Sequence, residues 1–190
     1  MSLYDRFGKR LLDFVLAGSA LAVLSPLMLL TAAAIWLEDR GTPFFRQERV
    51  GQRGKLFRIV KFRSMPVGTP SVPSDAAKSL RVTRVGGFIR RTNIDELPQL
   101  WNVLRGHMSL VGPRPALPSQ LSLVTLREQR GADRVAPGLT GLAQVNAYDG
   151  MPEIEKAEWD SRYERSVSML GDLRIMLSTV GYLMRRPPVY

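Results

Sequence analysis

An apolar run over residues 11–37 is the feature that most limits what this chain can fold into. It holds one charged residue, Asp13, near its start, and its length is ample for a helix to cross a bilayer core of about 30 Å. No clear signal-peptidase site is present, and acidic residues stand beside the basic ones before the run, which favours a permanent anchor over a cleaved signal. We therefore expect a membrane protein.

The middle of the run carries Ser25 and Pro26. A proline at this position removes a backbone hydrogen bond and clashes with the preceding turn, so we expect a kink. Basic residues flank the run on both sides, and the positive-inside rule would keep both flanks on the cytoplasmic face. A re-entrant helix hairpin with its bend at Ser25 and Pro26 satisfies both observations. A tilted, kinked helix that spans the bilayer is the alternative.

The chain of 190 residues has a formal net charge of +10, which calls for an anionic partner such as nucleic acid, an anionic membrane or a phosphorylated substrate. It contains no cysteine and one histidine, His107. These counts exclude a disulfide framework, a thiol nucleophile and a zinc–thiolate site, and they leave little room for a histidine relay. Any catalysis must rest on carboxylates, lysines, arginines and hydroxyl groups.

Beyond the apolar run, residues 44–51 and 56–65 have the composition of two short strands about a Gly-Gln-Arg-Gly turn, which predicts a hairpin with imperfect alternation. Residues 66–74 hold three prolines and are typical of a mobile surface loop. A leucine-rich helix should follow Pro115 and end near Gly131. Residues 153–186 have amphipathic helical spacing, which fits a helix on the bilayer surface and a helix packed on the domain equally well.

Two adjacent acids, Asp95 and Glu96, stand inside this basic chain. The pattern places them in the first turn of a short helix, with Thr92 as its cap and Pro98 tolerated in the first turn. A carboxylate there tends to stay ionised because it lies at the positive end of the helix dipole. The apolar stripe expected on this helix consists of Leu97, Leu100, Trp101 and Leu104, with Trp101 in the core.

Arginines surround these acids, and Pro113 and Pro115 enclose one of them. The two prolines restrict the backbone, so a stiff loop can aim the guanidinium of Arg114. Enough positive charge is present to hold an anionic substrate against an anionic nucleophile that would otherwise repel it. Farther along, Gly138 and Gly141 would let backbone amides approach a phosphate.

Four features occur in order: the apolar run with Ser25 and Pro26, the Lys-Phe-Arg-Ser-Met block at 61–65, Asp-Glu-Leu-Pro-Gln-Leu-Trp-Asn at 95–102, and Val-Gly-Pro-Arg-Pro at 111–115. Together they resemble the monotopic phosphoglycosyl transferases, a bacterial sugar-transferase superfamily. The resemblance covers nearly the whole chain, extends through residues 137–145, and matches the minimal catalytic form of the superfamily.

The resemblance implies transfer of a sugar 1-phosphate from a UDP-sugar to undecaprenyl phosphate, with release of UMP. It makes Asp95 the nucleophile that forms a covalent phosphosugar-aspartate, and Glu96 an aid to geometry and metal placement. It also implies Mg²⁺ held at Asp95 and Glu96. By position, Lys61, Arg90 and Arg114 would contact phosphate.

The same resemblance implies an α+β, predominantly helical fold. Residues 1–40 would form the re-entrant membrane helix, and residues 41–190 a catalytic domain with a short β-hairpin and C-terminal amphipathic helices. That domain would lie on the cytoplasmic face of the bacterial inner membrane. Many relatives have an acidic residue in place of His107 and a Gly-Arg pair in place of Ala147 and Tyr148, so sugar and nucleotide contacts do not carry over there. The sugar, the glycan pathway and the oligomeric state are not indicated.

Two other hypotheses explain part of the sequence. A basic, membrane-anchored module could bind anionic lipid or nucleic acid without catalysis, but it would give the two acids no role, and no nucleic-acid-binding motif is evident. We therefore expect no nucleic-acid partner. A single-pass regulatory protein would require the apolar run to span the bilayer.

Overall fold

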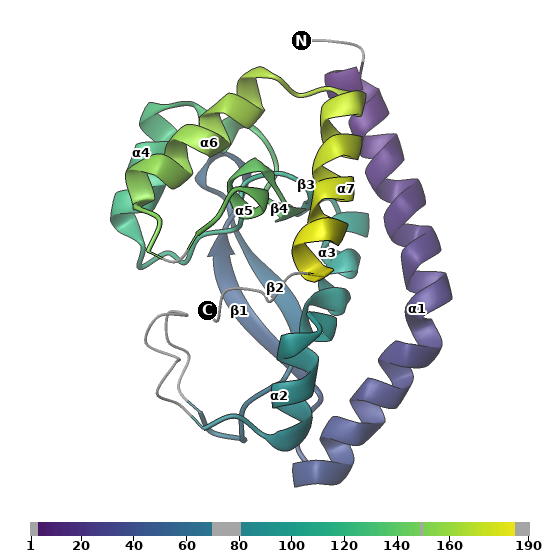
Figure 1. Ribbon diagram of the computed structural model, residues 1–190. Helices are drawn as coiled ribbons and strands as arrows, with labels where there is room; N and C mark the ends of the chain where they lie inside the picture. Colours follow the sequence, from purple (N-terminus) through teal and green to yellow (C-terminus); the bar gives the residue numbers. More distant parts are fainter. Residues whose placement is uncertain (1–3, 70–80, 149, 185–190) are drawn as a thin grey trace.

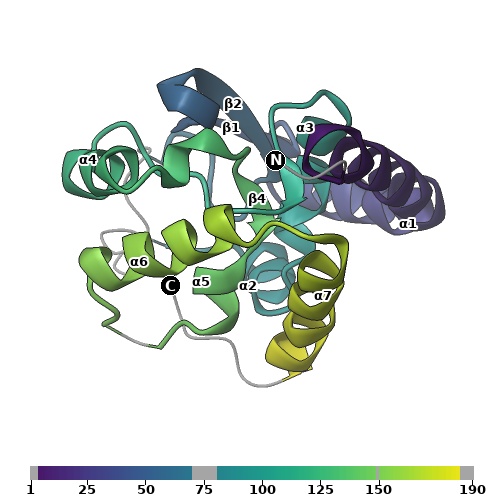
Figure 2. The ribbon, with the colours of Figure 1, turned by 90° about the horizontal axis from the view of Figure 1, so that it is seen from above.

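The computed structural model describes residues 4–69, 81–148 and 150–184. One long helix, α1 (Lys9–Asp39), runs along one side of a mixed body of helices and two small sheets (Figures 1 and 2). The other elements, in chain order, are η1 (Tyr4–Gly8), β1 (Phe44–Val50), η2 (Gln52–Gly54), β2 (Leu56–Phe62), α2 (Arg84–Arg91), η4 (Ile94–Gln99), α3 (Leu100–Leu104), β3 (Ser109–Val111), α4 (Leu121–Gln129), η5 (Ala132–Arg134), β4 (Gly138–Thr140), α5 (Leu142–Val145), α6 (Glu153–Arg165) and α7 (Met169–Met184). The α+β, mainly helical class is confirmed. Parts of two predicted segments, residues 70–74 and 185–186, lie outside the described residues.

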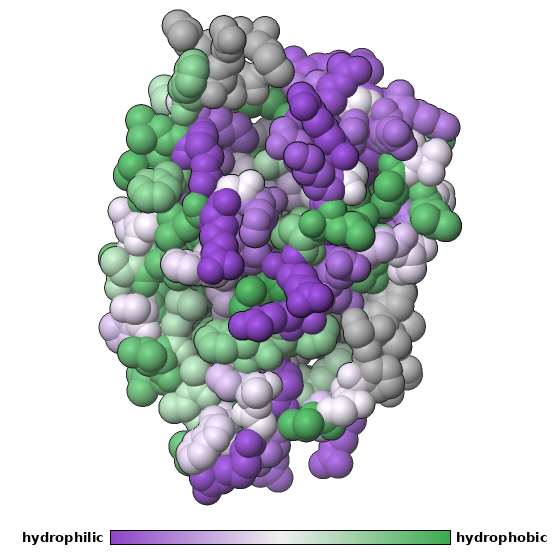
Figure 3. All heavy atoms as spheres, turned by 180° about the vertical axis from the view of Figure 1, so that it is seen from behind, coloured by the Kyte–Doolittle hydropathy of each residue, from purple (hydrophilic) through white to green (hydrophobic). Residues whose placement is uncertain are grey.

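Helix α1 has 31 residues and is the one helix of the described chain that is long and apolar enough to cross a membrane. Its buried residues follow an i, i+4 spacing, so a narrow stripe faces the body. The edge that α1 forms, on the left in Figure 3, is largely apolar, whereas polar residues gather over the middle of that face. Its large exposed apolar side chains are Leu11, Phe14, Val15, Val23, Leu27, Leu29, Leu30, Trp36 and Leu37.

Ser25 and Pro26 lie on the exposed surface of α1, and the helix continues through them. The Ser25 hydroxyl donates a hydrogen bond of 2.8 Å to the Ala22 carbonyl. Figure 1 shows that the helix axis bends along its length without reversing. The predicted kink is therefore present as a bend within one continuous helix, because one proline removes one hydrogen bond and leaves the flanking turns intact.

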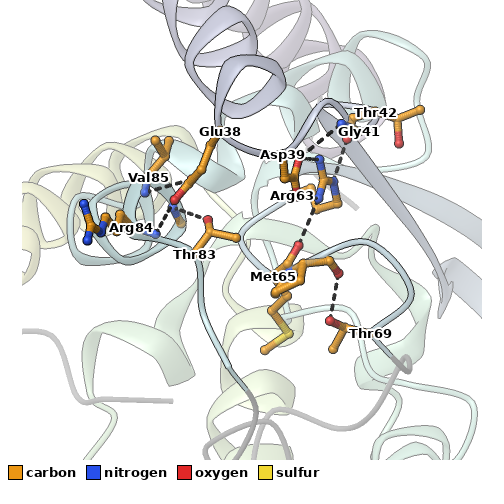
Figure 4. Close-up of polar contacts among 12 residues, drawn as sticks. Glu38, Asp39, Gly41, Thr42, Arg63, Met65, Thr69, Thr83, Arg84 and Val85 are labelled. Atoms are coloured by element: carbon orange, nitrogen blue, oxygen red, sulfur yellow. Dashed lines mark hydrogen bonds and ion pairs between the residues drawn. The ribbon is translucent and has the colours of Figure 1, made fainter.

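The last two residues of α1 hold the neighbouring elements (Figure 4). The Glu38 carboxylate accepts hydrogen bonds of 2.7 and 3.1 Å from the backbone amides of Arg84 and Val85, which open α2. Asp39 forms an ion pair with Arg63, the residue that follows β2. The end of α1 thus fixes α2 and the end of the hairpin, and both carry site residues.

Strands β1 and β2 form the predicted antiparallel hairpin, with Phe44 opposite Phe62 and Arg49 opposite Phe57. The rings of Phe44 and Phe62 stack with 5.4 Å between their centroids. Phe57 and Ile59 point into the main core cluster, which α1 and α3 complete. The hairpin is thereby fixed against the helices on the face that includes every second residue of β2.

A second sheet, which the sequence did not predict, pairs β3 and β4 in parallel. A Cβ atom at Gly138 would lie 2.1 Å from the Gly112 nitrogen, so both positions are backbone contacts that a side chain would break. Close packing of the two strands, and not access to a phosphate, explains Gly138: its amide donates to the Pro113 carbonyl at 2.8 Å.

The C-terminal stretch divides into α6 and α7, and was predicted as one continuous helical region. Buried Asp172 of α7 accepts hydrogen bonds from Lys9 at 2.8 Å and from the Tyr163 hydroxyl at 2.8 Å. This polar cluster joins α7 to α1 and α6. One side of α7 therefore packs on the domain, whereas Met169, Leu170, Leu173, Leu177 and Val180 stay exposed.

Candidate active site

Asp95 and Glu96 lie in η4, a 3₁₀ turn that precedes α3, and not in the first turn of an α-helix. The predicted cap at Thr92 is wrong, because the Thr92 hydroxyl donates to the Phe88 carbonyl at 2.9 Å and closes α2 instead. Asn93, with φ of 54°, then reverses the chain into η4. Asparagine tolerates this left-handed conformation better than most residues.

Trp101 was expected in the core, and this is also wrong. Its side chain is 49% exposed, and the guanidinium of Arg105 lies over the ring, 5.0 Å from its centroid. Because the α-helix begins at Leu100, the buried apolar positions are Leu100 and Val103, and Trp101 turns outward.

Glu96 lies at the centre of a charged cluster that it forms with Lys61 and Arg114. Its Oε1 atom accepts a hydrogen bond from Lys61 Nζ at 2.6 Å and another from Arg114 Nη2 at 2.7 Å. Burial acts to raise the pKa of Glu96, but the charges of Arg114 and Lys61 and their hydrogen bonds outweigh burial and hold this pKa below its usual value. Glu96 therefore stays ionised and joins a strand residue to the Pro-Arg-Pro loop.

Asp95 is in a different state, although it is the next residue. Among the described residues, no hydrogen bond or ion pair is made to its carboxylate. Burial, reinforced by the negative charge of Glu96, raises the pKa of Asp95 to about 6, against the opposing influence of Lys61, Arg90 and Arg114. At neutral pH this carboxylate is mostly ionised, unpaired and more basic than an ordinary aspartate.

The three predicted phosphate contacts all act on the two acids. Lys61 and Arg114 bind Glu96 directly, and the positive charge of Arg90 acts on Asp95. Arg90 is half-buried in the last turn of α2, whereas Arg91 beside it is exposed, so the structure separates two arginines that the sequence could not. By contrast, Ser25 and Pro26 are not part of this cluster and lie on the outer surface of α1.

Lys61 owes its place to strand periodicity. It follows Phe57 and Ile59 on the inward face of β2, which is why the alternation of this strand looked imperfect in the sequence. Buried Asn102 fixes the strand: its side chain accepts from the Val60 amide at 3.0 Å and donates to the Arg58 carbonyl at 2.8 Å. Asn102 lies within the matched motif, but sequence analysis gave it no role.

Two further arginines, which the sequence did not single out for the site, hold the Arg114 loop. Arg127 of α4 donates to the Arg114 carbonyl at 2.8 Å, and Arg49 of β1 donates to the Pro115 carbonyl at 3.1 Å. The alternation of β1 could have identified Arg49, because it places this side chain on the inward face of the hairpin, opposite Phe57. No local signal marked Arg127, because its role depends on a contact between distant segments.

Arg49 is a largely buried cation that lies near a second cation, Arg114. Burial, together with the positive charge of Arg114, lowers the pKa of Arg49 to about 10, although the charge of Glu96 acts in the opposite direction. Arg49 still carries its proton at neutral pH. Its Nε atom is buried and has no hydrogen-bond partner in the described part of the chain.

A pocket of about 130 Å³ adjoins the Arg114 loop. The turn of the hairpin, the loop itself, α4 and η5 form its walls, and both Arg114 and Arg127 line it. Apolar walls with a few charged groups are typical of small-molecule sites.

The described residues contain no group of three or more acidic, histidine or cysteine side chains that could hold a metal ion. A magnesium ion needs no such group, because it binds through one or two carboxylates together with substrate phosphates and water. The uncommitted carboxylate of Asp95 fits that role, with Glu96 beside it.

Comparison with known proteins places these observations in a family. The model of the family described as bacterial sugar transferase matches residues 4–186. A UDP-glucose:undecaprenyl-phosphate glucose-1-phosphate transferase from Caulobacter vibrioides is 43% identical over 96% of this chain and 72% of its own length. The Escherichia coli K12 protein of the same name is 40% identical over 93% of this chain and 40% of its own length.

A UDP-galactose-lipid carrier transferase from Erwinia amylovora is 35% identical over 98% of this chain. The chain spans only 42% of that relative's length. For most of the relatives compared, the match is thus confined to about two fifths of the longer protein.

Proposed function

Because this chain belongs to the bacterial sugar transferase family, we propose that it transfers a sugar 1-phosphate from a UDP-sugar to undecaprenyl phosphate and releases UMP. The names of its relatives support this substrate class. The observation that carries the proposal is the contrast between two adjacent acids: Glu96 is committed to two cations, whereas Asp95 has a raised pKa and no bonded partner. A pair whose environments push the pKa values apart is typical of a catalytic site.

The reaction proceeds in two displacements at one phosphorus atom. An Asp95 carboxylate oxygen attacks the β-phosphorus of the UDP-sugar, an oxygen–phosphorus bond forms, and the bond to the bridging oxygen breaks, so that UMP leaves with that oxygen. A phosphate oxygen of undecaprenyl phosphate then attacks the same phosphorus and the bond to Asp95 breaks. The product is a polyprenyl diphosphate sugar, and the carboxylate is regenerated.

Lys61, Arg90 and Arg114 supply the charge that lets an anionic nucleophile meet an anionic substrate. Each lies on a different element, so the diphosphate would be contacted from several sides. Positive groups fixed in advance stabilise the charge that develops on the transferred phosphoryl group and on the leaving UMP. Glu96 keeps Lys61 and Arg114 in place before substrate binds.

Magnesium is part of the proposal, with Asp95 and Glu96 as its protein ligands. When bound, the ion would neutralise charge on the diphosphate and favour departure of UMP. Glu96 offers fewer free positions than Asp95, because one of its oxygens already accepts two hydrogen bonds.

The apolar surface of α1 supports attachment to a membrane, from which the lipid phosphate would reach the site without leaving the bilayer. We place the domain on the cytoplasmic face of the bacterial inner membrane, where nucleotide sugars are found. We also propose that the bend at Ser25 and Pro26 lets α1 enter and leave the bilayer on that face, in agreement with the basic flanks of the helix.

The test is UMP release from a panel of UDP-sugars, beginning with UDP-glucose and UDP-galactose, by the solubilised protein with magnesium and undecaprenyl phosphate. Asp95→Asn is the inactive variant, and Glu158→Gln, the same loss of charge on an exposed residue of α6, is a matched control away from the charged cluster and the pocket. Lipid-dependent release that Asp95→Asn abolishes and Glu158→Gln retains supports the proposal. Binding of anionic vesicles or DNA unchanged by Asp95→Asn, with no UMP formed from any donor, would favour the non-catalytic module.

A further inference from the structure

In the loop that carries Arg114, every carbonyl from Pro113 to Ala116 accepts a hydrogen bond. The four donors come from three parts of the chain: β4, α4 and the end of β1. They are the Gly138 amide to Pro113 at 2.8 Å, Arg127 Nη1 to Arg114 at 2.8 Å, Arg49 Nη1 to Pro115 at 3.1 Å, and the Val50 amide to Ala116 at 2.9 Å. The Arg114 backbone is thus fixed by tertiary contacts and not only by its proline neighbours.

Arg127 is itself held in place by a buried acid. Its Nε and Nη2 atoms lie 2.8 and 2.7 Å from Asp160 Oδ2, and the Asp160 side chain is 1% exposed. Asp160 belongs to α6, so the pair joins α4 to α6 before Arg127 reaches the loop. A planar guanidinium can bind a carboxylate with one edge and a carbonyl with another, which a lysine cannot reproduce.

Arg49 approaches the same loop from the hairpin. Its Nη2 atom donates to the Gln47 side chain at 2.6 Å, which orients the guanidinium, while Nη1 reaches the Pro115 carbonyl. In the described residues no carboxylate lies within ion-pair distance of Arg49. Its positive charge therefore faces that of Arg114 and favours extension of the Arg114 side chain toward Glu96.

We propose that Arg127, held by Asp160, and Arg49 are positioning residues that set the Arg114 guanidinium against Glu96 and the transferred phosphate. The inference rests on the phosphoglycosyl-transfer reaction proposed above and names the part of the chain that aims one of its cations. A displacement of a catalytic group by about 1 Å costs on the order of a hundredfold in rate, even when the mutation that causes it lies far from the reacting atoms. The frame built from α4, α6 and β1 prevents that displacement.

The discriminating variant is Arg127→Lys, which keeps a cation for Asp160 but loses the second edge that bonds the Arg114 carbonyl. We expect kcat/KM for UMP release to fall about tenfold, the usual effect of one lost hydrogen bond to a charged donor. Arg134→Lys, the same change on an exposed residue of η5, should stay within about twofold of wild type. A wild-type value for Arg127→Lys would overturn the proposal.

A double-mutant cycle separates positioning from other roles. If Arg127 acts through the Arg114 side chain, then Arg127→Lys should change the residual rate of Arg114→Ala by less than about twofold. The same cycle applied to Arg49→Lys should also be non-additive. If either arginine contacts substrate directly, or supports the fold in general, its full effect persists in the Arg114→Ala background, and the proposal fails for that residue.

Thermal unfolding of the variants and UMP release by the wild type separate a loss of positioning from a loss of folded protein and from failure of the proposed reaction. Thermal unfolding should shift by less than about 5 °C in each lysine variant, so that a loss of rate is not a loss of folded protein. Should Arg127→Lys exceed that shift, Arg49→Lys tests the frame through a separate bond. Absence of UMP release from wild-type protein would instead refute the proposed reaction, whereas an active wild type with additive cycles refutes only the positioning role.

Discussion

Asp95 and Glu96 are adjacent in the chain and are shifted in opposite directions: burial raises the pKa of Asp95 to about 6, whereas Arg114 and Lys61 hold the pKa of Glu96 below its usual value. The same turn therefore contains one committed and one uncommitted carboxylate. This division supports the proposed attack by Asp95 and the supporting role proposed for Glu96, and it has consequences for rate and stability.

Removal of the nucleophile should abolish the reaction. Asp95→Asn and Asp95→Ala are expected to lower turnover by more than about 10³-fold, because no other described carboxylate in the cluster is uncommitted. Glu96→Ala and Arg114→Ala should reduce turnover severely without unfolding the domain. Radiolabelled UMP release measures all four, and wild-type-like turnover in Asp95→Ala would remove the proposed nucleophile.

The raised pKa of Asp95 predicts that its ionisation lowers the free energy of unfolding. A folded pKa above the unfolded value of 3.8 means that ionised Asp95 destabilises the fold above about pH 6. Asp95→Asn should therefore raise the free energy of unfolding by about 1–3 kcal/mol at pH 8 in metal-free buffer, and the gain should disappear below about pH 4. Denaturant unfolding across this range measures it, and a constant difference would contradict the burial argument.

Glu96→Gln should show the opposite sign. Because the folded pKa of Glu96 is lowered, its charge stabilises the fold above its ordinary pKa of 4.5, and this contribution is lost as the pH falls. The variant should be less stable than wild type near pH 7 and approach it in acid. Increased stability of Glu96→Gln at neutral pH would show that the cluster with Lys61 and Arg114 does not hold in solution.

Asn102 connects hairpin and site. Asn102→Ala leaves the Val60 amide and the Arg58 carbonyl without their partner, which should cost about 2–3 kcal/mol of stability. It should also lower turnover, because β2 carries Lys61. Asn146→Ala, which removes an exposed asparagine, is the matched control and should be near wild type in both assays.

The bend in α1 predicts a topology. Pro26→Ala should leave the protein bound to membranes but favour a spanning helix, because the missing hydrogen bond is restored. The chain has no cysteine, so single cysteines at positions 2 and 190 can be labelled from either side of oriented vesicles. We expect both positions to be labelled from the same side when Pro26 is present, and from opposite sides in the Pro26→Ala variant. Opposite sides in the wild type would refute the re-entrant path.

Much of this protein could be predicted from residue patterns. The apolar helix, the hairpin, α4 and the cluster of Asp95 with basic residues all follow from local spacing and charge. The errors at Thr92 and Trp101 share one cause: the pattern placed the helix start before Asp95, whereas the α-helix begins at Leu100 after a 3₁₀ turn. Local propensity hardly distinguishes these two arrangements, and packing decides between them.

By itself, the sequence determined that the chain has a membrane-length apolar helix, a basic composition, and carboxylate, lysine, arginine and hydroxyl groups as the available chemistry, because these depend on composition and short-range order. Only the tertiary structure decided which acid stays free. Lys61, Arg114, Arg49 and Arg127 come from distant segments, and their contacts with Glu96 and with the Arg114 loop exist only once the strands and helices pack together. Burial and charge at close range, which set the two pKa values apart, are properties of that packing.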